Sequence, residues 1–267
     1  MNKVVLITGA SSGIGKAIGE LLHQKGFVVY GTSRNPEKIA HSVFPLLSLE
    51  VKDPASIQTT VANVIALSGR LDVVINNAGV GITGPLEEIP IQEIKINFET
   101  NFFGPIEVMK AVLPQMRLQK SGLIINITSI AGYMGLPYRS IYSASKGALE
   151  LVTEALRMEV KPFGISVTNV APGDFATNIA AGRFHTPVLA RSAYEVPYAH
   201  TLKMMDAHVD QGSSPSEMAT AIYDIIQNPN PKIHYKVGET MQKLAIVLKR
   251  LLPDKIYERM LMRHYKL

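Results

Sequence analysis

A tyrosine and a lysine stand four residues apart in the segment Tyr142-Ser143-Ala144-Ser145-Lys146. Side chains at this spacing share one face of a helix, so both can reach the same ligand. A free tyrosine has a pKa of roughly 10. We expect the ammonium of Lys146 to lower the pKa of Tyr142 and so make it a usable acid and base. Ser129 follows an apolar run earlier in the chain, where its hydroxyl can point at the same cleft. The tyrosine–lysine pair alone is weak evidence, because the same spacing occurs on many ordinary helices.

The turn after the first apolar run is rich in glycine and reads Thr8-Gly9-Ala10-Ser11-Ser12-Gly13-Ile14-Gly15. Glycine allows a tight turn and a close approach of backbone N–H groups to an anion. The start of the following helix adds partial positive charge. The spacing Gly-x-x-x-Gly-x-Gly differs from the general dinucleotide fingerprint. We predict that this turn binds a pyrophosphate; the alternative is an ordinary strand–helix turn.

The second apolar run ends in Gly31-Thr32-Ser33-Arg34. NAD-selective proteins place an acidic residue there, against the ribose 2′-hydroxyl. Arg34 would instead bind a 2′-phosphate through charge-assisted hydrogen bonds. The sequence therefore predicts NADP(H) as cofactor. The alternative is a solvated surface arginine, and no basic residue of the glycine-rich turn adds support, because Ser12 stands there.

Short apolar runs alternate with longer amphipathic segments along the chain. The runs span 4–8, 27–32, 45–49, 72–76, 122–128, 165–170 and 233–237, and the amphipathic segments lie near 14–25, 54–68, 90–119, 138–161 and 215–227. This alternation predicts an α/β fold with helices on both faces of a parallel sheet. We expect a doubly wound sheet of seven strands in the order 3-2-1-4-5-6-7, with the active site beyond the carboxyl ends of the strands.

Composition excludes several classes of protein. The 267 residues are 46% hydrophobic and 18% charged, which indicates a folded chain. No cysteine is present, so disulfides, thiolate catalysis and cysteine metal sites are excluded. We read no signal peptide and no membrane-spanning stretch, and we expect a cytoplasmic location. The histidines at 185, 200 and 208 lack a usual ligand spacing, so no metal site is expected.

The organisation along the chain predicts one domain. Residues 1–237 form the dinucleotide-binding body, in which about 175–214 form a mobile lid, and residues 238–267 form an amphipathic helical extension. The extension carries two apolar stripes separated by Pro253, flanked by basic residues. It either packs on the body or on a neighbouring subunit, or lies in the plane of an anionic membrane surface. Most of the net charge of +5 lies in this extension, which argues against a nucleic-acid partner.

These motifs, together with Asn76-Asn77-Ala78-Gly79, Asn101 and Pro172-Gly173, closely resemble the classical short-chain dehydrogenase/reductase family. The resemblance covers residue 3 to about residue 237, and the extension resembles that of retinol- and hydroxysteroid-dehydrogenase-like members in general character. It implies a Rossmann-type fold and reversible NADP(H)-linked interconversion of a carbonyl and an alcohol. It also implies a homodimer or homotetramer, assembled through helices 90–119 and 138–161.

The resemblance implies a role for each site residue. Tyr142 would exchange the substrate proton, Ser129 would polarise the substrate oxygen, Lys146 would bind the nicotinamide ribose, and Asn101 would hold a water that links Lys146 to solvent. The cofactor would be bound by Gly9, Ser11, Ser12, Gly13, Ile14, Gly15, Ser33, Arg34, Glu50, Val51, Asn77, Ala78, Gly79, Tyr142, Lys146, Pro172, Gly173 and Thr177. Glu50 departs from the family pattern, which usually has an aspartate against the adenine.

The substrate is the least defined part of the prediction. Tyr133, Met134, Leu136 and Phe175 flank the expected catalytic residues, and an apolar substrate follows if they face it; the alternative is that they are packing residues. Two other functions share these motifs. Sugar-nucleotide epimerases and dehydratases carry the tyrosine–lysine pair but usually have a larger C-terminal domain. Non-catalytic NADP sensors usually lose a member of the serine–tyrosine–lysine set.

Overall fold

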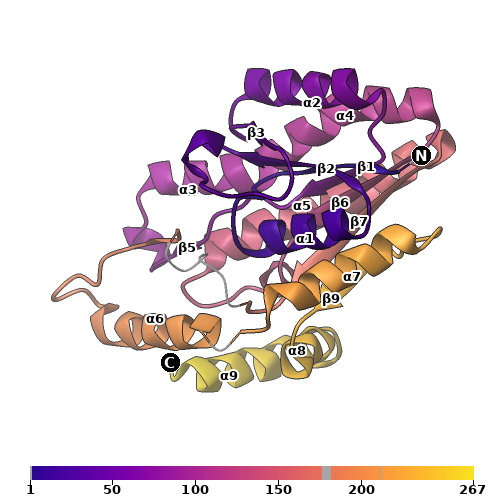
Figure 1. Cartoon of the computed structure of the whole chain (residues 1–267). Coiled ribbons are helices and arrows are strands. Elements are labelled where there is room, and N and C mark those ends of the chain that lie inside the picture. The colour runs from indigo at the N-terminus through magenta and orange to yellow at the C-terminus, as the bar shows by residue number, and fades with distance from the viewer. Residues whose placement is uncertain (1, 176–181, 211) are drawn as a thin grey trace.

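The computed structural model describes residues 2–175, 182–210 and 212–267 (Figure 1). Seven parallel strands form one sheet in the order β3-β2-β1-β4-β6-β7-β9. Their bounds are β1 Val4–Ile7, β2 Val28–Ser33, β3 Leu46–Ser48, β4 Val73–Asn76, β6 Gly122–Ile127, β7 Ile165–Pro172 and β9 His234–Val237. Counted within this sheet, the order is the predicted 3-2-1-4-5-6-7, so the doubly wound, Rossmann-type α/β fold is confirmed.

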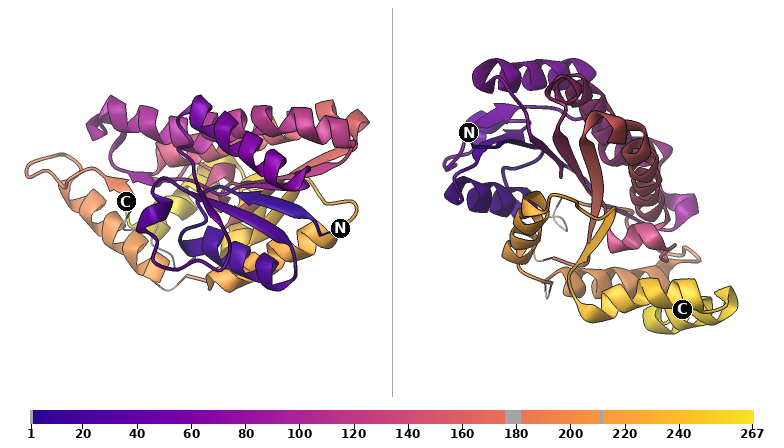
Figure 2. Two further views of the ribbon diagram at one scale, coloured as in Figure 1. Left: turned by 45° about the horizontal axis from the view of Figure 1, so that its top comes forward. Right: turned by 90° about the vertical axis from the view of Figure 1, so that its right-hand side faces the viewer.

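Both faces of the sheet are buried under helices. Along β1, Val4 and Leu6 join one apolar cluster, whereas Val5 and Ile7 join a second cluster on the opposite face. The first cluster is covered by α2 (Pro54–Ser68), α4 (Gly104–Gln119) and α5 (Ser140–Val160), and the second by α1 (Gly13–Gln24) and α7 (Pro215–Gln227). The two helix layers lie on either side of the sheet in Figures 1 and 2. Burial on both faces explains why the strands are apolar throughout.

The predicted helix 90–119 is divided in the structure. α3 (Ile91–Phe98) passes into one π-helical turn, Glu99–Phe103, and α4 then begins at Gly104. A π-turn places one additional residue in the helix and changes the direction of the side chains around it. Asn101 lies in this turn and is fully buried. The division therefore affects a predicted site residue.

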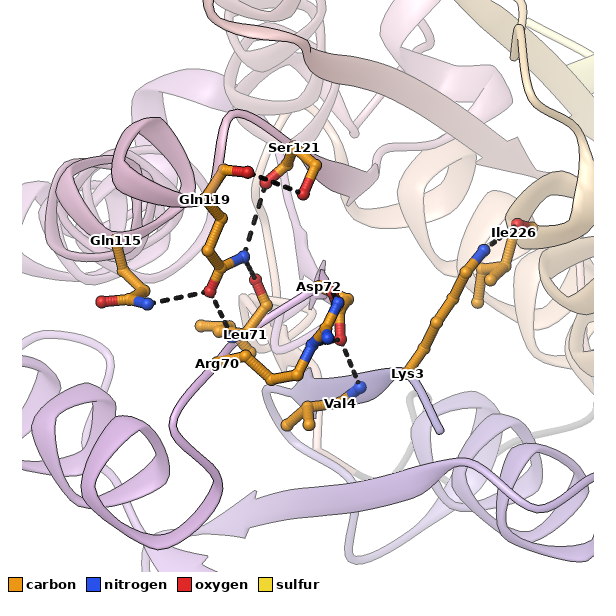
Figure 3. Close-up of polar contacts among 9 residues, drawn as sticks. All are labelled: Lys3, Val4, Arg70, Leu71, Asp72, Gln115, Gln119, Ser121 and Ile226. Atoms are coloured by element: carbon orange, nitrogen blue, oxygen red, sulfur yellow. Dashed lines mark hydrogen bonds and ion pairs between the residues drawn. The ribbon is translucent and has the colours of Figure 1, made fainter. Parts of the chain in front are cut away.

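A polar cluster holds the sheet at the edge where β1 and β4 begin (Figure 3). Asp72 Oδ2 accepts hydrogen bonds from Val4 N at 2.8 Å and from Arg70 Nε at 2.9 Å. The side-chain amide of Gln119 pairs with the backbone of Leu71, accepting from N at 2.8 Å and donating to O at 2.9 Å. These bonds satisfy backbone groups at the starts of the strands, opposite the edge where the site is expected.

The segment predicted as a lid contains regular structure. β8 (Phe184–His185) pairs with β5 (Ile82–Thr83) in a small parallel sheet, and α6 spans Glu195–Asp210. Two-residue strands leave no periodicity to detect, so the sequence analysis missed them. Tyr198 fixes α6 to this sheet, because its buried hydroxyl donates to Thr186 O at 3.0 Å. The described part of this segment therefore contains a packed helix and a short strand, and its movement as a lid stays a prediction.

The C-terminal extension folds as two helices, α8 (Thr240–Leu251) and α9 (Asp254–Tyr265), separated at Pro253 as predicted. Ile246 and Tyr257 are buried in an apolar cluster with Ile130, Met134 and Ala171 of the body. The inward faces of both helices are therefore packed on the body. No helix in the described part of the chain is long and apolar enough to cross a membrane.

Adjacent residues of α8 allow a test of this packing. Ile246 is 1% exposed and Val247 is 44% exposed. We expect Ile246→Asp to lower the melting temperature by several degrees, because it buries a carboxylate in an apolar cluster. Val247→Asp should leave the melting temperature nearly unchanged. Thermal unfolding followed by circular dichroism measures both; equal melting temperatures would contradict the packing. Binding to anionic vesicles that only Val247→Asp abolishes would favour membrane attachment instead.

Candidate active site

The glycine-rich turn lies between β1 and α1 in a conformation that requires glycine. Gly9 has a φ of +66°, in the left-handed region. A Cβ on Gly15 would collide with the side chain of Asn77 and the carbonyl of Gly9. The Asn77 amide Nδ2 donates to Thr8 O and Gly9 O, both at 2.9 Å. The segment after β4 thus fixes the turn and leaves the first N–H groups of α1 directed into the space beyond it.

A cleft of about 590 Å³ lies at the carboxyl ends of the strands, within the size range of ligand-binding clefts. Fifteen of the predicted cofactor residues line it: Gly9, Ser11, Ser12, Gly13, Ile14, Ser33, Arg34, Glu50, Val51, Asn77, Ala78, Gly79, Tyr142, Lys146 and Pro172. Gly15 and Gly173 are not among the lining residues, and Thr177 lies outside the described residues. Another hollow, of about 630 Å³, lies between α7 and β9 and is lined by none of the predicted residues. We therefore assign the site to the first cleft.

The end of the cleft beside β2 is basic. Arg34 and Lys38 both line it, next to Ser33. Lys38 was missed by the sequence analysis, because only the short 3-10 turn Pro36–Lys38 brings it back toward the strand end. Two exposed cations beside a serine hydroxyl can bind an anionic group of a ligand.

Glu50 also lines the cleft, but one oxygen of its carboxylate is bonded to the neighbouring backbone. Its Oε1 accepts a hydrogen bond from Lys52 N at 3.1 Å, and its own N–H donates to Ser56 Oγ at 3.0 Å. These bonds hold the turn between β3 and α2. The carboxylate therefore retains its second oxygen for a ligand, consistent with the less certain adenine contact expected for this position.

Tyr142 lines the cleft and meets Ser129, which is buried beside it and is not itself among the lining residues. A side-chain hydrogen bond joins them, and Ser129 Oγ also accepts from Ala131 N at 3.2 Å. Burial raises the pKa of Tyr142, whereas the bond to Ser129 and the charges of Arg139 and Arg183 lower it and Asp174 raises it. The net direction is upward, so the lowering by Lys146 expected from the sequence is not what the structure shows. Burial outweighs the nearby cations.

Lys146 is buried one turn further along α5. Its Nζ donates to Ile127 O, the last residue of β6, at 2.9 Å. Burial lowers the pKa of Lys146 to about 8, and the charge of Glu150 opposes that shift. A Cβ on Gly79 would lie 3.3 Å from Lys146 Nζ. The absence of a side chain at Gly79 therefore leaves room for the ammonium beside the cleft.

Asn101 is brought close to this group by the π-turn. Its Oδ1 accepts from Val80 N and its Nδ2 donates to Val80 O, both at 2.9 Å, so the amide holds the loop after β4. A Cβ on Gly79 would also lie 3.1 Å from Asn101 Oδ1, which places Asn101 and Lys146 on either side of the same glycine. The structure thus brings together the four predicted catalytic residues.

The loop after β7 is tied to the C-terminal extension. Gly173 N donates to Val237 O at 2.8 Å. The side chain of Gln242 on α8 donates from Nε2 to Asp174 Oδ2 at 2.9 Å and accepts from Asp174 N at 3.1 Å. α8 therefore supports the Pro172-Gly173 turn, a contact that the sequence analysis did not foresee.

The residues that were expected to face the substrate take part in apolar packing. Tyr133, Met134 and Leu136 follow Ser129 in the sequence and pack against α8 and α9; this apolar cluster is called the apolar wall, and none of the three residues lines the cleft. Phe175 is buried in the opposite cluster, among residues of α1 and α7, and its assignment to the substrate side is wrong. Phe175 pairs with Ser213 in an isolated parallel bridge, and its ring lies in the core. No group of three possible metal ligands occurs among the described residues.

A glycine-rich strand–helix turn and Lys146 line one cleft with Tyr142, which is bonded to Ser129; together they define a dinucleotide-dependent oxidoreductase. Residues 3–187 match the family model for the short chain dehydrogenase, so the chain belongs to the short-chain dehydrogenase/reductase family. It is 41% identical to the 3-ketodihydrosphingosine reductase of Bacteroides thetaiotaomicron over 96% of this chain and 95% of that protein.

Solved structures show the same fold. A short-chain dehydrogenase from Streptomyces avermitilis is 32% identical with a TM-score of 0.85, covering 100% of this chain and 97% of its own. An alcohol dehydrogenase from Thermococcus sibiricus, complexed with 5-hydroxy-NADP, is 25% identical with a TM-score of 0.73, covering 90% of this chain and 97% of its own. The chain is thus an oxidoreductase of this family with a nucleotide-binding Rossmann-type fold.

Proposed function

We propose that the chain is an NADPH-dependent reductase of apolar, long-chain ketones, with Tyr142 as the general acid. The observation that carries this proposal is one cleft lined by Arg34 and Lys38 beside β2 and by Tyr142 and Lys146 of α5, with Ser129 bonded to Tyr142. The residues fit the cofactor: the turn at Gly9–Gly15 would hold the pyrophosphate, and Arg34 with Lys38 the 2′-phosphate. The nicotinamide, when bound, supplies the hydride.

The side chains then have separable tasks in reduction. Ser129 donates a hydrogen bond to the substrate oxygen, and Tyr142 gives its phenolic proton to that oxygen as negative charge develops there. The raised pKa of Tyr142 keeps the phenol protonated at neutral pH, as reduction requires. Lys146 binds the ribose hydroxyls next to Tyr142 and stabilises the phenolate that remains after proton transfer.

The substrate class rests on two observations. The apolar wall of Met134 and Leu136 with α8 and α9 follows Ser129 closely in the chain, and the part of the substrate beyond the carbonyl would extend along it. The relative named 3-ketodihydrosphingosine reductase matches the chain over nearly its whole length, the extension included. A ketone with a long alkyl chain satisfies both.

A substrate panel tests the proposal. NADPH consumption is followed by absorbance with 3-ketodihydrosphingosine, a short aliphatic ketone and a sugar nucleotide as substrates. We expect turnover with the long-chain ketone, with kcat/KM at least roughly 10-fold above that of the short ketone, because each buried methylene adds binding energy of about 0.8 kcal/mol. Faster turnover of the short ketone, or of the sugar nucleotide, would contradict the proposed substrate class.

The cofactor preference gives a further prediction. Arg34→Ala should weaken NADPH binding by roughly 10- to 100-fold, because one charge-assisted hydrogen bond contributes about 1.5–3 kcal/mol. NADH binding should barely change, since NADH has no 2′-phosphate. Fluorescence titration of both cofactors measures this. Lys16→Ala, which removes an exposed lysine of α1 paired with Glu20, is the control. Equal affinity of the unaltered protein for NADPH and NADH would refute the NADP assignment.

Assembly is the last part of this proposal. Large apolar side chains are exposed on α4 and α5 and just before them, at Phe103, Leu118, Leu151 and Met158. Clusters of this kind mark association surfaces. We expect a homodimer or homotetramer by light scattering at micromolar concentration, and Leu151→Glu should shift the population toward smaller species. A monomeric parent protein would refute this.

A further inference from the structure

A buried glutamate lies one helical turn beyond Lys146, and none of the roles above uses it. Glu150 of α5 is 6% exposed. Thr128 Oγ1, at the end of β6, donates to its Oε1 at 2.9 Å, and the hydroxyl of Tyr133 also hydrogen-bonds its carboxylate. Both of these partners are neutral hydroxyls. Burying a carboxylate against neutral partners is costly, so the position of Glu150 needs a reason.

Hydrogen bonds connect Glu150 to the surface. The Tyr133 hydroxyl lies 3.2 Å from His234 Nδ1, and His234 Nε2 lies 2.9 Å from Glu154 Oε1. The side chain of Glu154 is 46% exposed, so the chain of hydrogen bonds ends in solvent. It runs from α5 through the turn after Ser129 and β9, and returns to α5.

The charges around Glu150 come from several elements. Burial raises its pKa to about 7; hydrogen bonds from Thr128 and Tyr133 lower it, Glu154 of α5 raises it, and Lys236 of β9 lowers it. Lys236 Nζ also lies 5.2 Å from the centre of the Tyr133 ring, and Arg250 of α8 lowers the pKa of Tyr133. In turn, the carboxylate of Glu150 raises the pKa of Lys146 against the effect of burial. Both groups therefore titrate close to neutral pH.

We propose that Glu150 is a positioning residue that keeps Lys146 protonated, and that the Tyr133–His234–Glu154 hydrogen bonds let Glu150 exchange protons with solvent. The inference rests on the proposed role of Lys146 in the reductase reaction. The carboxylate acts on Lys146 through space, and its own charge follows the bulk pH without passing through the cofactor cleft.

The exchange step balances in protons. With Glu150 ionised, Tyr133 donates its proton to the carboxylate and accepts the proton of His234 Nδ1. Transfer of both protons along these two bonds protonates Glu150, leaves Tyr133 neutral and removes one proton from the imidazole. Solvent first protonates the exposed Glu154, whose carboxyl gives that proton to His234 Nε2 in the same step; the imidazole thus stays neutral with its proton moved from Nδ1 to Nε2, and Glu154 returns to its ionised form.

The titration of Lys146 tests the proposal without any substrate. The protein alone is labelled with 13C at the lysine Cε, and the Lys146 signal is assigned by its absence in Lys146→Met. Glu150→Gln retains a hydrogen-bonding side chain and removes the charge, so the titration midpoint of Lys146 should fall by roughly one pH unit. Glu154→Gln is the matched control on the same helix. The negative charge of Glu154 raises the pKa of Glu150, so removing that charge lowers the pKa of Glu150. The titration midpoint of Lys146 should therefore stay constant or rise slightly.

A second variant keeps the test decisive if Glu150→Gln does not fold. Tyr133→Phe removes one hydrogen bond to the carboxylate and so raises the pKa of Glu150; the Lys146 midpoint should fall by a smaller amount. An unchanged Lys146 midpoint in the folded variants would overturn the proposal. With active protein, the limb of kcat that belongs to Lys146, which lies below the limb of Tyr142, should move in the same direction as the midpoint. The unaltered protein could fail to reduce any carbonyl substrate while Glu150→Gln still shifts the Lys146 midpoint. That combination would refute the proposed function but not the effect of Glu150 on Lys146.

Discussion

Replacing Tyr142 by phenylalanine should lower kcat for ketone reduction by roughly 10²- to 10⁴-fold, the usual contribution of a positioned general acid. The substitution removes only the hydroxyl, and the ring keeps its place at the start of α5. NADPH affinity should therefore remain within about 3-fold of the parent value, since one neutral hydrogen bond contributes only about 0.5–1.5 kcal/mol. Steady-state kinetics and fluorescence titration measure the two quantities on one preparation.

The pH dependence provides the control for this variant. In the parent protein, kcat/KM for reduction should fall as the pH rises through the pKa of Tyr142, because only the protonated phenol donates. Since burial raises that pKa, the fall should begin above neutral pH. The residual rate of Tyr142→Phe should lack the limb that belongs to the phenol, whereas the limb that belongs to Lys146, whose pKa is about 8, should remain. Activity near the parent level would show that another group donates the proton.

Replacing Lys146 by methionine should impair both turnover and cofactor binding. The ammonium is buried and bonded to Ile127 O, and methionine fills a similar volume without charge. We expect kcat to fall by roughly 10²-fold or more and NADPH to bind roughly 10-fold more weakly, because a charged hydrogen bond to the ribose is lost. The combination of both effects separates this variant from Tyr142→Phe.

Lys110→Met is a suitable control for that experiment. Lys110 is an exposed residue of α4 that pairs with Glu107 at 2.7 Å, so its loss should leave both kcat and NADPH affinity unchanged. If Lys146→Met weakens neither turnover nor binding, the assignment of Lys146 to the ribose fails, although the family and the fold are unaffected.

The features that depend on local patterns were predictable from the sequence. Apolar runs buried on both faces gave the seven strands and their order, because parallel sheets leave few alternatives for strand–helix alternation. Glycine at positions 9, 13 and 15 identified the turn, since a positive φ and close contacts exclude side chains there. For the same reason, nearly all predicted cofactor residues line one cleft.

The features that depend on distant packing were not predictable. The π-turn at Asn101 has no residue signature that distinguishes it from an ordinary helical turn, so residues 90–119 predict one continuous helix. Phe175 follows Pro172-Gly173 in sequence, but it pairs with Ser213 and its ring lies in the core. The direction of the pKa shift of Tyr142 depends on burial, which spacing along a helix does not report.

The contact between Gln242 and Asp174 has a consequence for how such enzymes diversify. The family match ends at residue 187, yet α8, which lies beyond it, supports the turn at the edge of the cofactor cleft and forms the apolar wall after Ser129. Substitutions in the last thirty or so residues can thus reshape the substrate side while the hydride-transfer machinery stays intact. Exchanging this extension between relatives would be a direct route to new substrate preferences. The exchange would have to include Asp174 of the body, so that Gln242 of the extension keeps its hydrogen-bond partner.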